Sequence, residues 1–129
     1  MISTNSASSG DDKSILLRVR VFSKWTSYKL RTKGIVVDNI VKKIKNGVIL
    51  VNLAEVLTNI TKHKAWTRNP TKSFQYEENI ELALDLFEKH GVKFHTKIVK
   101  AKEIAEGNMK SINSLIWSLI MKYTVEPAV

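Results

Sequence analysis

Large apolar residues recur at helical spacing in the first quarter of the chain. Intervals of four, four and three residues place four of them on one face of a helix: Leu17, Val21, Trp25 and Tyr28. Gly34 follows this stretch, and glycine commonly ends a helix. The pattern predicts a first ordered helix over residues 15–31.

The next segment, IVVDNIVKKI at residues 35–44, has two interpretations. Its β-branched residues favour a strand, whereas Asp38 followed by apolar residues at helical spacing suits a short helix. We favour the helix, because no neighbouring segment offers a strand partner. A turn at Asn46 then leads into another helix, for which the spacing predicts this buried stripe: Ile49, Leu53, Val56 and Leu57.

Two further helices are predicted in the second half of the chain, after a long polar connection at residues 58–73. The first covers residues 77–90, carries Ile80, Leu84 and Phe87 on one face, and ends at Gly91. A loop with a short helical turn near Glu103 leads to the final helix at residues 109–123. Its apolar residues lie on or near one face: Ile112, Leu115, Ile116, Leu119 and Ile120. The pattern therefore predicts an all-α protein.

The two ends of the chain have a different character. Residues 1–14 are polar, with no apolar stretch of the kind found in signal peptides, so we expect a disordered leader. Residues 125–129 are interpreted as the start of a linker or tail. No apolar run approaches the ~20 residues that a membrane-spanning helix needs. At 129 residues without cysteine, the chain fits one domain that needs no disulfide bonds.

Positive charge is concentrated in the first half of the chain. The formal net charge is +9, and residues 1–65 hold 12 Lys or Arg against 4 Asp or Glu. Residues 66–129 hold 9 against 8. An uneven basic excess favours an acidic partner, and nucleic acid, anionic lipid and an acidic protein filament all meet that description.

The residue pattern predicts no enzyme. The five glycines are scattered, so no phosphate-binding loop is present. The three histidines, His63, His90 and His95, lack the spacing of a metal site. The acids of residues 77–88 fit the solvated face of one helix better than an acid–base pair. We therefore expect no catalytic residue, no metal and no cofactor.

Three stretches in order resemble a known family: FSKWTSYKL, NGVILVNLAEVL, and ENIELALDLFEKHGVKF continuing to KEIAEGNMKSINSLIWSLIMKY. They are similar to the calponin homology (CH) domain, in particular the amino-terminal, actin-binding kind of filamin, α-actinin and spectrin. The resemblance covers about residues 15–124. It implies a compact all-α bundle of four main helices with shorter connecting helices.

Several residues of these stretches have structural interpretations. Trp25 and Trp117 are expected to be buried anchors of the first and last helices. Gly47 is expected at a turn that needs an unusual backbone angle, as is Gly107. Asn79 and Asn108 are expected to hold loops by hydrogen bonds to backbone groups.

The resemblance implies a non-catalytic actin-filament-binding module of a cytoplasmic, cytoskeleton-associated protein. Carried onto matching positions, the first contact patch runs from Phe22 to Arg31, with Lys24, Lys29 and Arg31 exposed, and the preceding segment adds Arg18 and Arg20. The second patch lies on the last helix, outside its buried stripe. Its members are Lys110, Ser111, Asn113, Ser114 and Lys122.

The last helix departs from the family pattern. Family members often read close to KLTLGLIW where this chain reads KSINSLIW, so Ser111 and Asn113 replace leucines and Ser114 replaces glycine. If those leucines contact actin, each loss weakens binding by about 1–3 kcal/mol. Only one CH domain is present, so a second CH domain or other domains of a larger chain are candidate partners.

Other functions use the same features. One alternative is a regulatory or scaffolding CH domain that binds a signalling protein, and another is a microtubule-binding CH domain. Anionic phospholipid could contact Lys110, Lys122 and nearby cations. Nucleic acid ranks low, because the sequence has no base-reading motif or stacking set.

Overall fold

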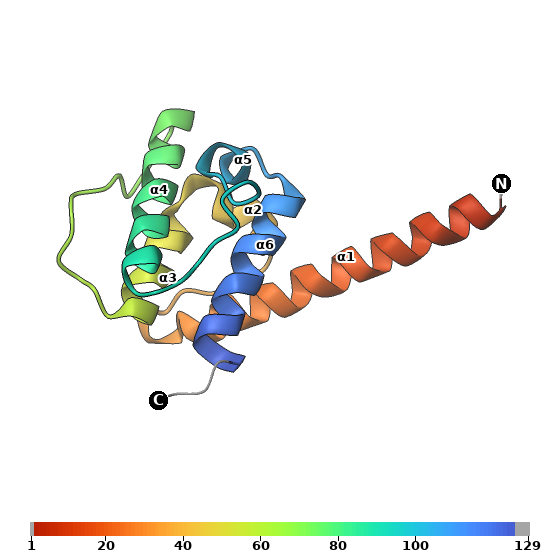
Figure 1. The fold of residues 1–129 in the computed structure, drawn as a ribbon, viewed down its shortest axis with the longest axis horizontal. Coiled ribbons are helices and arrows are strands. Elements are labelled where there is room, and N and C mark those ends of the chain that lie inside the picture. The colour runs from red at the N-terminus through yellow and green to blue at the C-terminus, as the bar shows by residue number, and fades with distance from the viewer. Residues whose placement is uncertain (1, 126–129) are drawn as a thin grey trace. The chain divides into compact units, whose positions relative to one another are not determined.

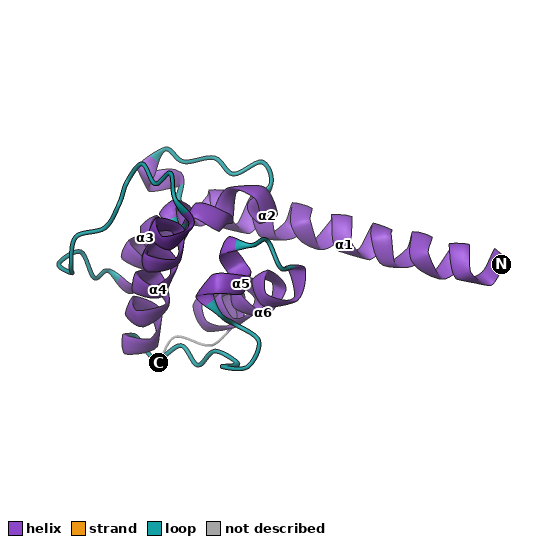
Figure 2. Ribbon diagram, turned by 90° about the horizontal axis from the view of Figure 1, so that it is seen from above, coloured by secondary structure: helices purple, strands orange, loops and turns teal. Residues whose placement is uncertain are grey.

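A computed structural model describes the backbone of residues 2–125 and the side chains of residues 13–124. The predicted linker or tail at 125–129 therefore lies outside the described side chains. Four longer helices are present: α1 (Ile2–Lys29), α3 (Val48–Thr58), α4 (Ser73–Lys89) and α6 (Met109–Ile120) (Figure 1). No strand occurs in the described part of the chain, as the colouring of Figure 2 shows. The predicted all-α class is confirmed.

Short elements connect the longer helices. They are α2 (Ile40–Lys43), α5 (Ala101–Ala105), two 3₁₀ turns, η1 (Arg31–Lys33) and η2 (Ile44–Asn46), and a π-helical turn, η3 (Met121–Val125). The chain divides into two compact units, residues 1–40 and residues 41–129. The short helix favoured for residues 35–44 is present at α2. The segment before it, residues 35–39, forms neither helix nor strand and is named the extended segment.

In the first unit, α1 differs from the sequence prediction in its start. The helix begins at Ile2, so it runs through the leader for which we expected disorder. Continuing a helix is less costly than nucleating one, and the leader contains no proline to stop it.

The buried face of α1 also differs from the predicted apolar face. Leu17, Val21 and Tyr28 are exposed, with 62% of Leu17 accessible. The buried residues of the helix and its end are Phe22, Ser23, Thr26 and Leu30. Ser23 and Thr26 are tolerated there because each hydroxyl donates to a carbonyl one turn earlier, at Val19 (2.6 Å) and Phe22 (2.8 Å).

In the second unit, α3 packs against α4, and α5 contacts both α4 and α6. The two views show α3 and α4 side by side. The predicted stripe of α3 is largely wrong, because Leu53 is buried but Ile49, Val56 and Leu57 are only half-buried. This helix is apolar around most of its circumference, so its spacing alone does not identify the core face. The residues buried instead are Leu50, Val51, Ala54 and Thr58.

Gly47 and Asn79 join the start of α3 to α4. Gly47 has a φ of 81°, and a Cβ there would overlap the Cβ of Asn79. The buried Asn79 amide donates to the carbonyls of Asn46 (3.1 Å) and Thr67 (2.8 Å), and its oxygen accepts the Thr67 N–H (3.1 Å). The roles predicted for this glycine and this asparagine are confirmed.

Helix α4 begins earlier than predicted, at Ser73. The side-chain oxygen of Gln75 accepts the N–H groups of Thr71 (2.8 Å) and Lys72 (3.1 Å), which satisfies donors at the helix start. Ile80 and Phe87 are buried as predicted, whereas Leu84 is half-buried.

Helix α6 follows its prediction closely. All five residues of the predicted stripe are buried, and the Asn108 side chain accepts the Ser111 N–H (3.0 Å) as an N-cap. The burial predicted for Trp117 is wrong, since 55% of this residue is exposed. It lies beside the filled stripe, on the same side of the helix as Met121, which is also exposed. Within the described residues, no helix is long and apolar enough to span a membrane.

Candidate functional site

A polar stripe on α1 organises the first candidate surface. Its members follow one another at intervals of three, one and three residues, which places them on one side of the helix: Arg20, Ser23, Lys24 and Ser27. The Ser27 hydroxyl donates to the Val37 carbonyl (3.1 Å) and accepts the Val37 N–H (2.8 Å). Ser23 accepts the Ile40 N–H (2.9 Å). The two serines therefore hold the extended segment before α2 against the helix.

A groove of about 540 Å³ lies between α1 and this segment. Its lining combines the α1 stripe with three residues of the extended segment: Val36, Val37 and Asp38. Val37 is buried, whereas 84% of Val36 is exposed to solvent. Asp38 accepts the N–H of Asn39 (2.7 Å). The groove thus offers two cations, one carboxylate and an aliphatic surface.

Two aromatic rings and two cations lie close together around the end of α1: Trp25, Tyr28, Lys29 and Arg31. The Arg31 guanidinium lies 4.0 Å from the centre of the Tyr28 ring and donates to the Tyr28 carbonyl (2.7 Å). The Lys29 ammonium lies 5.8 Å from the Trp25 ring and 5.9 Å from the Tyr28 ring. Lys29 is half-buried rather than exposed as predicted.

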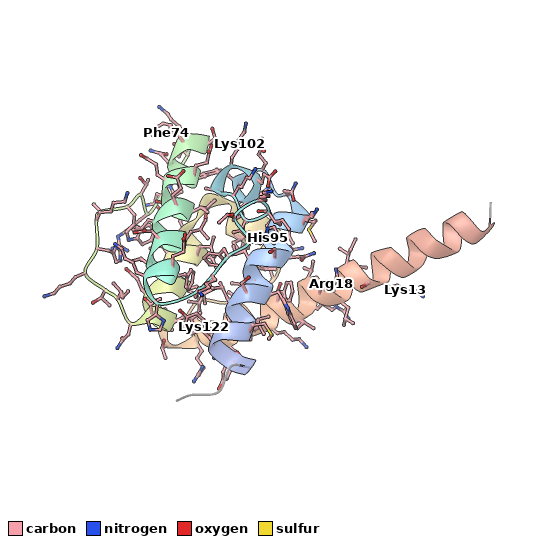
Figure 3. The ribbon with its side chains drawn as sticks, viewed as in Figure 1. Lys13, Arg18, Phe74, His95, Lys102 and Lys122 are labelled. Carbon is pink, nitrogen blue, oxygen red and sulfur yellow. The ribbon has the colours of Figure 1, made fainter. Side chains whose placement is uncertain are left out.

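The other predicted cations of α1 and η1 are exposed. Arg18, Arg20, Lys24 and Arg31 all point into solvent. Figure 3 shows Arg18 projecting from α1 itself. Arg18 and Arg20 therefore lie within the helix, and the helix continues on their N-terminal side.

The second candidate surface, on α6, differs from the prediction at one residue. Ser111 is completely buried, so its predicted position outside the buried stripe is wrong. Its hydroxyl accepts the N–H of Lys100 (3.3 Å), just before α5, which gives the serine a structural role. Lys110 is exposed, and Asn113 and Ser114 are half-buried.

Asn113 has an unusual environment. Its side-chain oxygen is buried, and no hydrogen-bond donor reaches it within the described part of the protein. A buried polar atom without a partner costs about 1–3 kcal/mol. The backbone carbonyl of the next residue, Ser114, accepts the hydroxyl of Ser118 (2.8 Å).

The far end of α6 carries an aromatic cluster. Tyr123, in η3, lies 2.8 Å through its hydroxyl from Nδ1 of His90, and the two rings are stacked with centres 5.7 Å apart. Phe87 lies 6.1 Å from the same tyrosine ring. Burial among these groups raises the pKa of Tyr123 from 10.0 to about 12.

A cavity of about 400 Å³ lies beside this cluster. Its lining includes Val92, Lys93, Trp117, Met121 and Lys122. Figure 3 places Lys122 at the C-terminal end of α6. Lys122 is half-buried, so it adds a cation to an aromatic and aliphatic surface.

A half-buried contact between His63 and Glu55 fastens the long connection to α3. Nε2 of His63 lies 2.7 Å from the Glu55 carboxylate, and Nδ1 lies 3.0 Å from the Lys64 carbonyl. This contact explains the histidine structurally. The described residues contain no group of three or more acidic or histidine side chains able to hold a metal ion.

The family model of the calponin homology (CH) domain matches residues 17–125, which is most of the chain. This chain belongs to the calponin homology domain family. The family resemblance predicted from the three sequence stretches is confirmed.

Relatives of this CH domain include large proteins. It is 34% identical over 107 residues to an alpha-actinin of Dermatophagoides farinae, a match covering 83% of the chain and 12% of that protein. It is 32% identical over 107 residues to the sarcomeric alpha-actinin of Drosophila melanogaster, covering 83% of the chain and 11% of the relative. Filamin-C of Rattus norvegicus is 27% identical over 109 residues, a match that covers 84% of the chain and 4% of filamin-C. The chain thus spans only a small part of each relative's length.

Sequence reasoning about this CH domain missed two features. The first is the groove beside α1, although the placement of Ser23 and Ser27 on the same helical side as Arg20 and Lys24 gave a signal for it. The second is the exposure of Trp117, which hydrophobicity alone does not reveal. Within the first unit, the structure brings Arg20 and Lys24 together on the groove and Lys29 and Arg31 around Tyr28.

Proposed function

We propose that this CH domain is a non-catalytic actin-filament-binding module of a cytoplasmic, cytoskeleton-associated protein. The observation that carries the proposal is family membership together with similarity to alpha-actinins and filamin-C. The sequence resemblance to the amino-terminal CH domains of such proteins points to actin as the filament.

The charge distribution of the first unit supports this proposal. Residues 13–40 contain seven Lys or Arg and one Asp. Four of the predicted contact residues there, Arg18, Arg20, Lys24 and Arg31, are exposed. Exposed cations with few neighbouring acids attract an acidic filament and raise its association rate.

The candidate contact set on α6 differs from the one that the sequence predicts. The buried Ser111 is removed from it, while Lys110 remains as an exposed cation. We add Trp117, because a large exposed aromatic residue provides contact area that the serine and asparagine substitutions lack. A second CH domain or anionic phospholipid are alternative occupants of this surface.

Co-sedimentation tests the proposal. The domain is mixed with actin filaments and, separately, with microtubules, at low and at physiological salt. Saturable pelleting with actin alone that persists at physiological salt is expected. Pelleting with both filaments that disappears as salt rises would indicate unspecific charge attraction. No pelleting at either salt concentration would favour a scaffolding CH domain.

Variants locate the contact within the domain. Lys24→Gln combined with Arg31→Gln should weaken actin binding, because both cations are exposed, one on α1 and one in η1 directly after it. Lys102→Gln is a matched control on α5, where an exposed lysine lies outside the proposed contacts. Equal loss in all variants would argue against a defined site on α1.

A further inference from the structure

The groove beside α1 has walls that are held in place before any ligand arrives. Ser27 forms two hydrogen bonds with the backbone of Val37, and Ser23 accepts the N–H of Ile40. The side chains of Val37 and Ile40 are buried, which also holds this part of the chain in place. A preformed site loses less conformational entropy on binding than a mobile one.

The two cations of the groove are available to a ligand. Arg20 and Lys24 are exposed, and neither makes an ion pair with any residue whose side chain the structure describes. They lie four residues apart on one helical face, where two like charges repel each other. An anionic ligand that contacts both would relieve this repulsion.

The apolar side of the groove favours an anion that also carries an apolar group. Val36 is the most exposed large hydrophobic residue of the described chain, at 84%, and it lines the groove together with the cations. An inorganic phosphate would leave this side chain in water. A peptide segment that carries carboxylates and an aliphatic side chain would cover Val36 and meet Arg20 and Lys24 together.

We propose that the groove formed by Arg20, Lys24 and Val36 binds an acidic peptide segment that bears an aliphatic residue. This inference rests on the proposed function, because it names the chemistry of the filament segment that α1 recognises. The carboxylates of the segment contact Arg20 and Lys24, and its aliphatic side chain packs on Val36.

Asp38 provides a further test of the proposal, because it lines the same groove and carries a negative charge. Its carboxylate accepts the Asn39 N–H and repels an acidic ligand. Removal of this charge should therefore tighten binding, whereas removal of Arg20 or Lys24 should weaken it. Opposite effects at neighbouring positions distinguish a groove ligand from general attraction to a basic surface.

The experiment is a binding titration of the full chain with a blocked peptide, Glu-Asp-Leu-Glu-Asp, followed by NMR chemical-shift changes. Lys24→Gln and Arg20→Gln are each expected to weaken binding by about three- to fivefold, and Asp38→Asn to tighten it by about as much. Lys33→Gln is the matched control, because this exposed lysine does not line the groove. It should change the affinity by less than about twofold.

Val36→Ser tests the apolar contact. It should weaken binding of the leucine peptide but leave a Glu-Asp-Ser-Glu-Asp peptide unchanged. Thermal unfolding of each variant checks that the fold is retained. The proposal is overturned if Lys33→Gln weakens binding as much as Lys24→Gln, if Asp38→Asn has no effect, or if inorganic phosphate binds as tightly as the leucine peptide.

Actin co-sedimentation of the same variants separates this inference from the proposed function. If filament binding follows the peptide affinities, both are supported. If filaments bind but Lys24→Gln, Val36→Ser and Asp38→Asn leave that binding unchanged, the proposed function holds and the groove inference fails. Peptide binding in the groove without any filament binding would support the groove and contradict the proposed function.

Discussion

Helices α1 and α6 bury their faces by different chemistry. Beyond its first turn, α6 is buried through an aliphatic row: Ile112, Leu115, Ile116, Leu119 and Ile120. The buried part of α1 includes two hydroxyl residues, Ser23 and Thr26. Each hydroxyl donates to a carbonyl of its own helix, so burial leaves no unpaired donor. A helix face can therefore be buried without being apolar, provided that its polar groups are satisfied locally.

This difference leaves α1 with apolar residues in water. Leu16, Leu17 and Val21 are all exposed, and together with the neighbouring cations they form a surface rather than a core. Helix α6 uses almost all of its aliphatic residues internally. The exposed apolar residues at its far end are chiefly Trp117 and, at the start of η3, Met121. Helix α1 exposes apolar residues because hydroxyl residues occupy part of its buried face. At the end of α6, apolar residues are exposed because the buried stripe is already filled.

The largest expected effect comes from matched truncations of leucine in the two helices. Leu115→Ala should lower the free energy of unfolding by about 2–5 kcal/mol, because the side chain is completely buried. Leu17→Ala should change it by less than about 0.5 kcal/mol, because that side chain lies in solvent. Urea unfolding followed by circular dichroism measures both. Similar losses at the two positions would show that the face of α1 bearing Leu17 is buried in solution.

The next effect concerns serines rather than leucines. Ser27→Ala removes both hydrogen bonds to the buried Val37 backbone and should cost about 1–3 kcal/mol. Ser118→Ala on α6 is the control, because that hydroxyl donates only to the Ser114 carbonyl within the helix. Its expected cost is below about 0.5 kcal/mol. Equal costs would mean that the Ser27 contacts do not hold the extended segment.

The contrast between the helices also explains which parts of the fold the sequence predicts. Aliphatic residues recur at helical spacing in α6 and polar residues occupy the other positions, so its five buried residues follow from spacing alone. In α1 the hydroxyl groups hide the buried face, because Ser23 and Thr26 count as polar in any periodicity. The groove depends on hydrogen bonds between residues 10 and 17 positions apart, and helical spacing carries no information about such contacts.

Site residues divide in the same way. Exposure of Arg18, Arg20, Lys24 and Lys110 follows from their charge. Burial of Ser111 does not, because it depends on the Lys100 backbone that the fold brings next to the hydroxyl. The assignment of actin contacts to particular residues remains a prediction that the variants above test.

A smaller effect is expected at Asn113 of α6, whose buried side-chain oxygen lacks a hydrogen-bond donor within the described residues. Asn113→Leu removes a buried oxygen without a partner and should raise the free energy of unfolding by about 1 kcal/mol. The same substitution at Asn79 should strongly destabilise the fold, since all three hydrogen bonds of that side chain are lost. Urea unfolding of the two variants compares them directly. A destabilised Asn113→Leu protein would show that the oxygen has a donor in solution.

The smallest effect is a pH dependence at the end of α6. Burial raises the pKa of Tyr123 to about 12, so in the folded state the phenol keeps its proton at a pH where the unfolded chain loses it. The resulting stabilisation is fully present below pH 10 and is lost as the pH rises from about 10 to about 12. Solvent screens this half-exposed group, so the loss should stay below about 1 kcal/mol. Tyr123→Phe provides the reference, because its lysines titrate as in the parent protein while the phenolic proton is absent. Unfolding measured from pH 8 to 11 should show the parent losing stability faster than Tyr123→Phe above pH 10. Parallel curves would contradict the desolvation of Tyr123 beside His90.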